Sequence, residues 1–174
     1  MVNKEISKLN KLILLFVFDK MELPLSENTI IDICCSTNTW ISYMDCKPTI
    51  NKLLENSFII NVSQYGDELY EITVEGRKCL SEFYTGIPEV TREQIAAFVK
   101  INRTRYRKKQ EYTADYYMNK DSTYTVFLKI HDVSKPLMEL KFAVPDRQQA
   151  KNIYKKWEQK ANKIYELLFE ELID

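Results

Sequence analysis

Apolar residues recur at helical spacing along the first third of the chain. Residues 6–21 carry such a stripe and predict a first helix. Ser26 is suited to cap a second helix, because its hydroxyl can accept a backbone N–H of the first turn. A third helix is expected to open at Asp45 or Lys47, with Pro48 in its first turn, where a missing N–H costs little. The pattern therefore predicts three consecutive helices.

The period then changes to that of strands. Residues 58–65 are rich in β-favouring residues, Gly66 supplies a tight turn, and residues 69–72 alternate as a half-buried strand does. Thr73 follows directly and is suited to cap a fourth helix. Three helices, a hairpin and a helix are the element order of a winged helix, in which the hairpin is the wing.

Four stretches carry a resemblance to a known family: residues 14–26, 40–43, 53–59 and 70–77. They resemble the bacterial domain of unknown function 4364 family, which is similar to winged-helix regulators in its first half. The resemblance spans the whole chain. It implies a winged-helix fold in the first half of the chain. It implies no activity, because none is established for that family.

The last stretch contains the motif Tyr-x-Ile-Thr-x-x-Gly-Arg, from Tyr70 to Arg77. Multidrug-responsive and phenolic-acid-responsive winged-helix repressors share this motif, so it supports the fold more than any ligand. Ser57 departs from the winged-helix pattern, which often has Gly after the third helix. Since Ser tolerates a left-handed backbone less readily than Gly, the end of that helix is expected to differ.

The second half predicts a separate unit. Thr91 begins a capping box for a fifth helix that runs to about Lys109. Three strands then follow at residues 112–117, 124–130 and 137–144, and a long last helix starts after Pro145. We therefore predict an α+β protein: a winged helix-turn-helix domain in residues 1–90, followed in residues 91–174 by a helix, a three-stranded antiparallel sheet and a long C-terminal helix.

Composition narrows the functional classes. The chain has 174 residues, 45% of them hydrophobic, which is enough for a substantial core. The absence of an apolar run of membrane length or a signal peptide favours the cytoplasm and no membrane partner. The four cysteines have no metal-binding spacing and are interpreted as buried thiols, and His131 is the only histidine. We therefore expect no enzyme, and we assign no catalytic residue, metal ligand or cofactor.

Charge is distributed unevenly along the chain. Residues 1–89 contain eight Lys and Arg against thirteen Asp and Glu, a difference of minus five, and the remainder has seventeen against twelve, plus five. Nonspecific affinity for a duplex comes mainly from cations that neutralise phosphates. The acidic first half therefore weakens the case for DNA binding by the winged helix.

The third helix is the candidate recognition helix. It is expected to present Lys47, Thr49, Asn51 and Lys52 outward, since Asn and Thr can contact base edges and Lys can contact phosphates. The alternative is a polar, solvated surface helix without a ligand. At the wing tip, Tyr65 could touch a DNA backbone, although the tip carries carboxylates and no cation, which favours an ordinary turn.

The fifth helix contains the densest basic cluster of the chain. We define this basic cluster as Lys100, Arg103, Arg105, Arg107, Lys108 and Lys109. Contact with phosphate is one interpretation. A solvated helix end, or an interface with the acidic half of a second chain, are the alternatives.

Apolar and aromatic residues of the second half leave further alternatives open. The aromatic residues expected on the sheet are Tyr112, Tyr116, Tyr117, Tyr124, Phe127 and Phe142. They could pack the core, line a ligand pocket or stack on bases. Val99, Asn102 and Tyr106 on the fifth helix, and the stripe of the last helix, could pack within the chain or pair with a second copy.

These observations favour a cytoplasmic transcriptional regulator that binds double-stranded DNA as a homodimer, since two recognition helices supply affinity that one cannot. A small-molecule effector is possible in such a regulator, and the sequence does not specify one. The alternative is a winged-helix module that binds other proteins and has no specific affinity for DNA.

Overall fold

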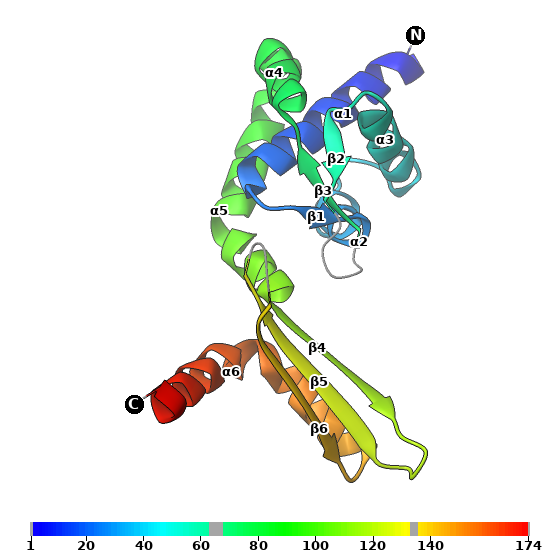
Figure 1. Cartoon of the computed structure of the whole chain (residues 1–174). Coiled ribbons are helices and arrows are strands. Elements are labelled where there is room, and N and C mark those ends of the chain that lie inside the picture. The colour runs from blue at the N-terminus through cyan, green and yellow to red at the C-terminus, as the bar shows by residue number, and fades with distance from the viewer. Residues whose placement is uncertain (1, 63–67, 133–135, 174) are drawn as a thin grey trace. The chain divides into compact units, whose positions relative to one another are not determined.

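The computed structural model describes residues 2–62, 68–132 and 136–173 (Figure 1). The chain forms two compact units, Met1–Arg103 (unit 1) and Thr104–Asp174 (unit 2). The predicted mixed α+β class is confirmed, since each unit contains helices and a three-stranded antiparallel sheet.

Unit 1 combines four complete α-helices, a short π-helix, a short 3-10 helix and part of a fifth α-helix with a small sheet. Its elements are α1 (Val2–Met21), β1 (Leu25–Ser26), α2 (Glu27–Ile31), η1 (Asp32–Thr37), α3 (Tyr43–Glu55), β2 (Ile59–Asn61), β3 (Leu69–Ile72), α4 (Val74–Phe83), η2 (Tyr84–Gly86) and the first turns of α5 (Glu89–Glu111). The sheet order is β1-β3-β2, so the predicted hairpin strands β2 and β3 do pair. Helix α1 packs against α3, α4 and β3 and supplies much of the buried core.

The division between the units lies inside α5, whereas sequence patterns divide the chain after residue 90. The first turns of α5 contact the loop that precedes α3. Trp40 Nε1 donates to Gln94 Oε1 at 3.2 Å, and the Trp40 and Phe98 rings meet edge to face at 5.8 Å. These contacts explain why the start of α5 groups with unit 1.

Helix starts follow the caps that the side chains provide. Ser26 caps α2 as predicted, because its Oγ accepts the Thr29 N–H at 3.2 Å. The predicted opening of the third helix at Asp45 or Lys47 is wrong: Ser42 is the N-cap, so α3 begins at Tyr43. Pro48 consequently lies inside the helix rather than in its first turn.

Thr73 joins the hairpin, the end of α3 and the start of α4. Its Oγ1 accepts the Gly76 N–H at 3.0 Å, as predicted for a cap, and donates to the Ser57 carbonyl at 2.7 Å. A Cβ on Gly76 would lie 2.2 Å from the Phe58 carbonyl oxygen. Only glycine allows so close a backbone approach, which gives the glycine of the sequence motif a packing role.

Ser57 ends α3 in a left-handed conformation, with φ of 57°. Its N–H donates to the Leu54 carbonyl and the Phe58 N–H to the Leu53 carbonyl, both at 2.9 Å. These two bonds form a Schellman motif. The helix therefore ends as it would with glycine at this position, and the expected difference caused by Ser57 is not found.

Unit 2 is a sheet covered on one face by a helix (Figure 1). Its elements are the end of α5, β4 (Tyr112–Met118), β5 (Tyr124–His131), β6 (Pro136–Val144) and α6 (Arg147–Ile173). The sheet order is β4-β5-β6, with Leu128 of the central strand paired to Ala114 and Leu140. Trp157 of α6 is buried on this sheet and donates Nε1–H to the Lys129 carbonyl at 3.1 Å. The predicted three strands and long last helix are confirmed.

The four cysteines are free in the structure. Cys34 and Cys46 are buried as expected, whereas Cys35 and Cys79 are only partly buried, so the interpretation of all four as buried thiols is wrong for these two. Burial raises the pKa of the Cys34 thiol and raises that of Cys46 to about 12, so both stay protonated at neutral pH. In the described part of the chain, no cluster of His, Cys, Asp or Glu is arranged to hold a metal ion. The described helices also include none with the length and apolar character needed to span a bilayer.

Candidate nucleic-acid interface

Helix α3 presents one buried and one exposed side. The buried row consists of Cys46, Thr49, Ile50 and Leu53. The exposed side, which we define as the outer face of α3, has two rows spaced four residues apart: Tyr43, Lys47 and Asn51, and beside it Met44, Pro48 and Lys52. Residues four apart lie one above the other on a helix, so these rows form one continuous surface.

Thr49 does not belong to this surface, and its expected outward position is wrong. Only 4% of it is exposed, and its Oγ1 donates to the Asp45 carbonyl at 2.7 Å. Thr49 lies three residues after Cys46 and four before Leu53, which places it on the core side of the helix. Its polar side chain is accommodated there because the hydroxyl bonds back to the preceding turn.

Tyr43 and Met44 belong to this surface, and sequence reasoning missed them. They expose 68% and 81% of their surface in the first turn of α3. They were missed because the helix was expected to start at Asp45 or later. The signal that could have revealed them is Ser42, which can cap the helix with Asp45 three residues on.

The cations of the outer face already contact neighbouring helices. Lys47 Nζ lies 3.1 Å from Glu27 Oε1 of α2, and this hydrogen bond to a carboxylate raises the pKa of Lys47. Lys52 Nζ donates to Ser7 Oγ of α1 at 3.4 Å. Asn51 is exposed between them along the helix. The surface thus combines two tethered ammonium groups, one amide and an apolar first turn.

The predicted wing tip is only partly described. Tyr65 lies outside the described residues, so its contact with a DNA backbone remains a prediction. The flanking strands β2 and β3 are present, and Glu68 accepts a hydrogen bond from the Tyr70 hydroxyl at 3.3 Å. This carboxylate adds negative charge at the end of the hairpin where the predicted wing tip begins.

The basic cluster is shared between the two units. Lys100 and Arg103 belong to unit 1, and Arg103 Nη1 lies 2.6 Å from Glu22 Oε2. The other members belong to unit 2 and are exposed: Arg105, Arg107, Lys108 and Lys109. Of these, Arg105 and Lys109 lie over the Tyr106 ring, at 5.1 and 5.7 Å from its centre. The two parts of the cluster therefore have separate surroundings, and Arg103 is partly neutralised.

Three of the six aromatic residues predicted on the sheet of unit 2 pack in its core. Tyr112, Tyr116 and Tyr124 are partly buried against the residues that α6 covers. Tyr117 and Phe127 alternate with these along the strands and lie on the other face, where Lys141 and Lys129 stand over their rings. On α5, the predicted apolar positions Val99 and Tyr106 are buried in the single chain.

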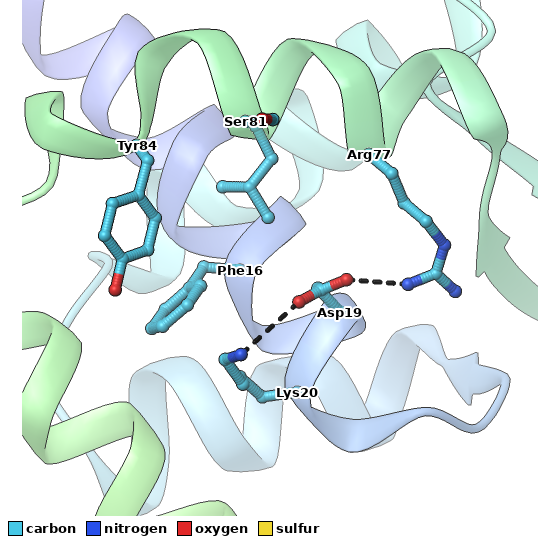
Figure 2. A pocket seen from close by; sticks show the side chains of 7 residues that line it. Phe16, Asp19, Lys20, Arg77, Ser81 and Tyr84 are labelled. Atoms are coloured by element: carbon cyan, nitrogen blue, oxygen red, sulfur yellow. Dashed lines mark hydrogen bonds and ion pairs between the residues drawn. The ribbon is translucent and has the colours of Figure 1, made fainter.

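A cavity of about 350 Å³ lies between α1 and α4 (Figure 2). The residues that line it are Phe16, Asp19, Lys20, Arg77, Leu80, Ser81 and Tyr84. Its charged groups satisfy one another: Asp19 lies 2.6 Å from Arg77 Nη1 and 3.6 Å from Lys20 Nζ. The Asp19–Arg77 ion pair joins α1 to α4. The binding of a small-molecule effector stays a prediction.

Comparison with known families gives one match. The model of the Domain of unknown function (DUF4364) family matches residues 10–172, nearly the whole chain. The chain belongs to this family. The resemblance expected from the sequence is thereby confirmed for both units of the DUF4364 chain. No curated protein and no solved structure matches it. The function of this DUF4364 protein must therefore be argued from its own surfaces.

Proposed function

We propose that this DUF4364 protein is a winged-helix transcriptional regulator that binds double-stranded DNA as a homodimer in the cytoplasm. In this proposal α3 is the recognition helix, its outer face enters the major groove, and the β2–β3 hairpin is the wing. Tyr43, Lys47 and Asn51 would meet base edges, while Lys52 would contact a phosphate.

The exposure of the outer face of α3 carries this proposal. Recognition helices contact bases mainly through residues near their N-termini, and here Tyr43 and Met44 project from the first turn. Asn51 can bond an adenine edge with both its donor and its acceptor. The buried row of the same helix fixes the direction in which these side chains point.

The charge of α3 accounts for the need for a dimer. Its exposed Lys47 and Lys52 are balanced by Asp45 and Glu55 on the same helix. With no net charge from this helix, one copy gains little from counterion release. A symmetric pair of recognition helices on two half-sites doubles the contacts without adding charge.

Selection of binding sites from a random duplex pool tests the proposal, followed by fluorescence anisotropy on the selected sequence. We expect Asn51→Ala and Tyr43→Ala each to weaken binding to the selected duplex by about tenfold, the lower range for a base contact, while binding to unrelated duplex hardly changes. Lys52→Gln should weaken binding to the selected duplex and to unrelated duplex alike, and should reduce the salt dependence of binding.

Lys78→Gln is the matched control, because Lys78 is an exposed cation of α4 with the same charge. It should bind DNA like the wild type. The proposal is wrong if no sequence is enriched from the pool, or if the α3 variants bind the enriched duplex as tightly as the control does.

A second candidate function is a protein-interaction module. It is favoured by one observation: the outer face of α3 begins with two strongly exposed apolar side chains, Tyr43 and Met44, and carries balanced charges. Aromatic residues and Met are enriched in protein interfaces. If the DNA experiment fails and Tyr43→Ala abolishes capture of a partner identified by cross-linking, this second function replaces the first.

A further inference from the structure

Helix α6 continues beyond the core that it covers. The residues of α6 that pack in the core of unit 2 end at Ile164 and Tyr165, and the helix runs on to Ile173 (Figure 1). Along these last turns Leu167, Phe169, Leu172 and Ile173 are 47–79% exposed. These side chains project to different sides of the helix, and Leu167 shares its side with the exposed Lys160 and Lys163.

The charges of α6 are separated along its length. Residues 147–163 carry six Lys and Arg and one Glu, whereas residues 164–173 carry three Glu and no cation. The first turn has no acidic residue and the last turn no basic one. This order opposes the helix dipole, which favours anions at the N-terminus and cations at the C-terminus. The stability of the isolated helix therefore does not explain it.

One exposed stripe of α6 contains both kinds of charge. Its members are Lys156, Lys160, Lys163, Leu167 and Glu170, at spacings of four, three, four and three residues. Such spacing keeps side chains on one side of a helix. Glu171 lies beside the end of the stripe, while Phe169 and Ile173 point to the other side of the helix. The stripe is thus basic at one end, apolar near its middle and acidic at the other end.

We infer that two copies of this chain associate through this stripe, with their α6 helices antiparallel. A twofold axis through the stripe midway between Lys163 and Leu167 places Lys160 of one copy beside Glu170 and Glu171 of the second, and the same pairs form again on the other side of the axis. Leu167 then packs on the aliphatic stem of Lys163 of the second copy. A parallel pair would instead align like charges, which disfavours it.

We call the contact between the two stripes the α6 seam. It is the surface that forms the dimer of the proposed function, and only the biological use of this seam rests on that proposal. Self-association through α6 can be measured without DNA. A chain that dimerises through the stripe and never binds a specific duplex would refute the regulator and leave the seam standing. A chain that binds a specific duplex as a dimer formed through another surface would refute the contact through α6 and leave the regulator standing.

Complementary charge reversal on the full chain tests the seam by sedimentation velocity. The acid-reversed variant carries Glu170→Lys and Glu171→Lys, and the base-reversed variant carries Lys160→Glu and Lys163→Glu. Each variant alone should associate at least about tenfold more weakly than the wild type, because all its facing charges then repel. An equimolar mixture of the two should recover the dimer, because the two stripes complement each other again.

Lys151→Glu with Lys155→Glu is the matched control, since it makes the same charge change at two exposed cations of α6 that lie off the stripe. It should dimerise like the wild type. Circular dichroism must show that all variants fold. We expect the acid-reversed variant to keep its helix, because cations at a helix C-terminus interact favourably with the helix dipole. A monomeric wild type at the highest soluble concentration, an unaffected single variant, a mixture without recovery or a weakened control would each overturn the inference.

Discussion

Each unit contains a three-stranded sheet, and the two sheets are held together in different ways. Unit 1 uses strands of two to four residues, and its hairpin is joined to α3 and α4 by bonds at Thr73 and a close approach at Gly76. Unit 2 uses strands of seven to nine residues covered by one helix. Short strands form few ladder bonds, so the sheet of unit 1 depends on these backbone contacts and on the buried core around it, whereas the sheet of unit 2 forms long ladders and is covered by α6.

This difference bears on function. The outer face of α3, which we propose contacts DNA, lies on a helix held at both ends, by the Ser42 cap and by the Schellman motif at Ser57. The association surface that we propose on α6 lies on a helix anchored to the sheet by Trp157. The predictions below separate backbone constraint from side-chain burial.

The largest effect is expected from Trp157→Ala. Removing this buried indole leaves a cavity under α6 and loses the bond to the Lys129 carbonyl, so unit 2 should lose about 3–5 kcal/mol of unfolding free energy. Tyr154→Ala on the same helix, with 48% of Tyr154 exposed, should cost far less. Hydrogen exchange resolved along the sequence measures the loss in unit 2, and equal losses for both variants would contradict dependence on burial.

Gly76→Ala should be the most damaging small change in unit 1. The added methyl would overlap the Phe58 carbonyl, and relieving that overlap must move α4 or the end of α3, at a cost of about 3 kcal/mol, the upper range for overpacking. Gly86→Ala is the control, since its Cβ would meet only the end of the Leu12 side chain at 3.1 Å. Chemical denaturation compares the two, and similar midpoints would refute the backbone constraint.

Much of this fold could be predicted from local patterns. The Thr73 cap, the hairpin and the three strands of unit 2 follow from turn residues and period-two alternation, and all three are found. These features depend on neighbours in the sequence, which is why pattern reasoning reaches them. Family membership was likewise predictable, since the motif residues lie in contiguous stretches.

What could not be predicted depends on choices between competing caps and on contacts distant in sequence. Ser42 and Asp45 could each begin α3, and the cap at Ser42 brings Tyr43 into the first turn, whereas Thr49 faces inward because of its spacing from Cys46 and Leu53. The pairing of Lys47 with Glu27 and of Arg103 with Glu22 joins residues far apart in the chain. The candidate surface therefore changed in membership, in part because α3 begins at Tyr43, earlier than predicted.

Thr73→Ala should have an intermediate effect. It removes the acceptor for the Gly76 N–H and the donor to the Ser57 carbonyl, so the loss should reach about 1–2 kcal/mol, at the upper range for an N-cap. Thr73→Ser keeps the hydroxyl and should retain most of the stability. Thermal unfolding followed by circular dichroism gives both values, and a serine variant as unstable as the alanine variant would show that the methyl group, rather than the bonds, matters.

The smallest effect is a gain. Ser57 pays for its left-handed backbone with steric strain that glycine does not have, so Ser57→Gly should stabilise unit 1 by about 0.5–1 kcal/mol after the greater freedom of glycine in the unfolded chain is subtracted. Glu55→Gly, two residues earlier in helical geometry, should instead destabilise by a similar amount. Denaturation midpoints of the two variants should therefore move in opposite directions from the wild type. If both midpoints fall, the backbone strain at Ser57 does not limit the stability of unit 1, because the surrounding contacts hold the Schellman end of α3.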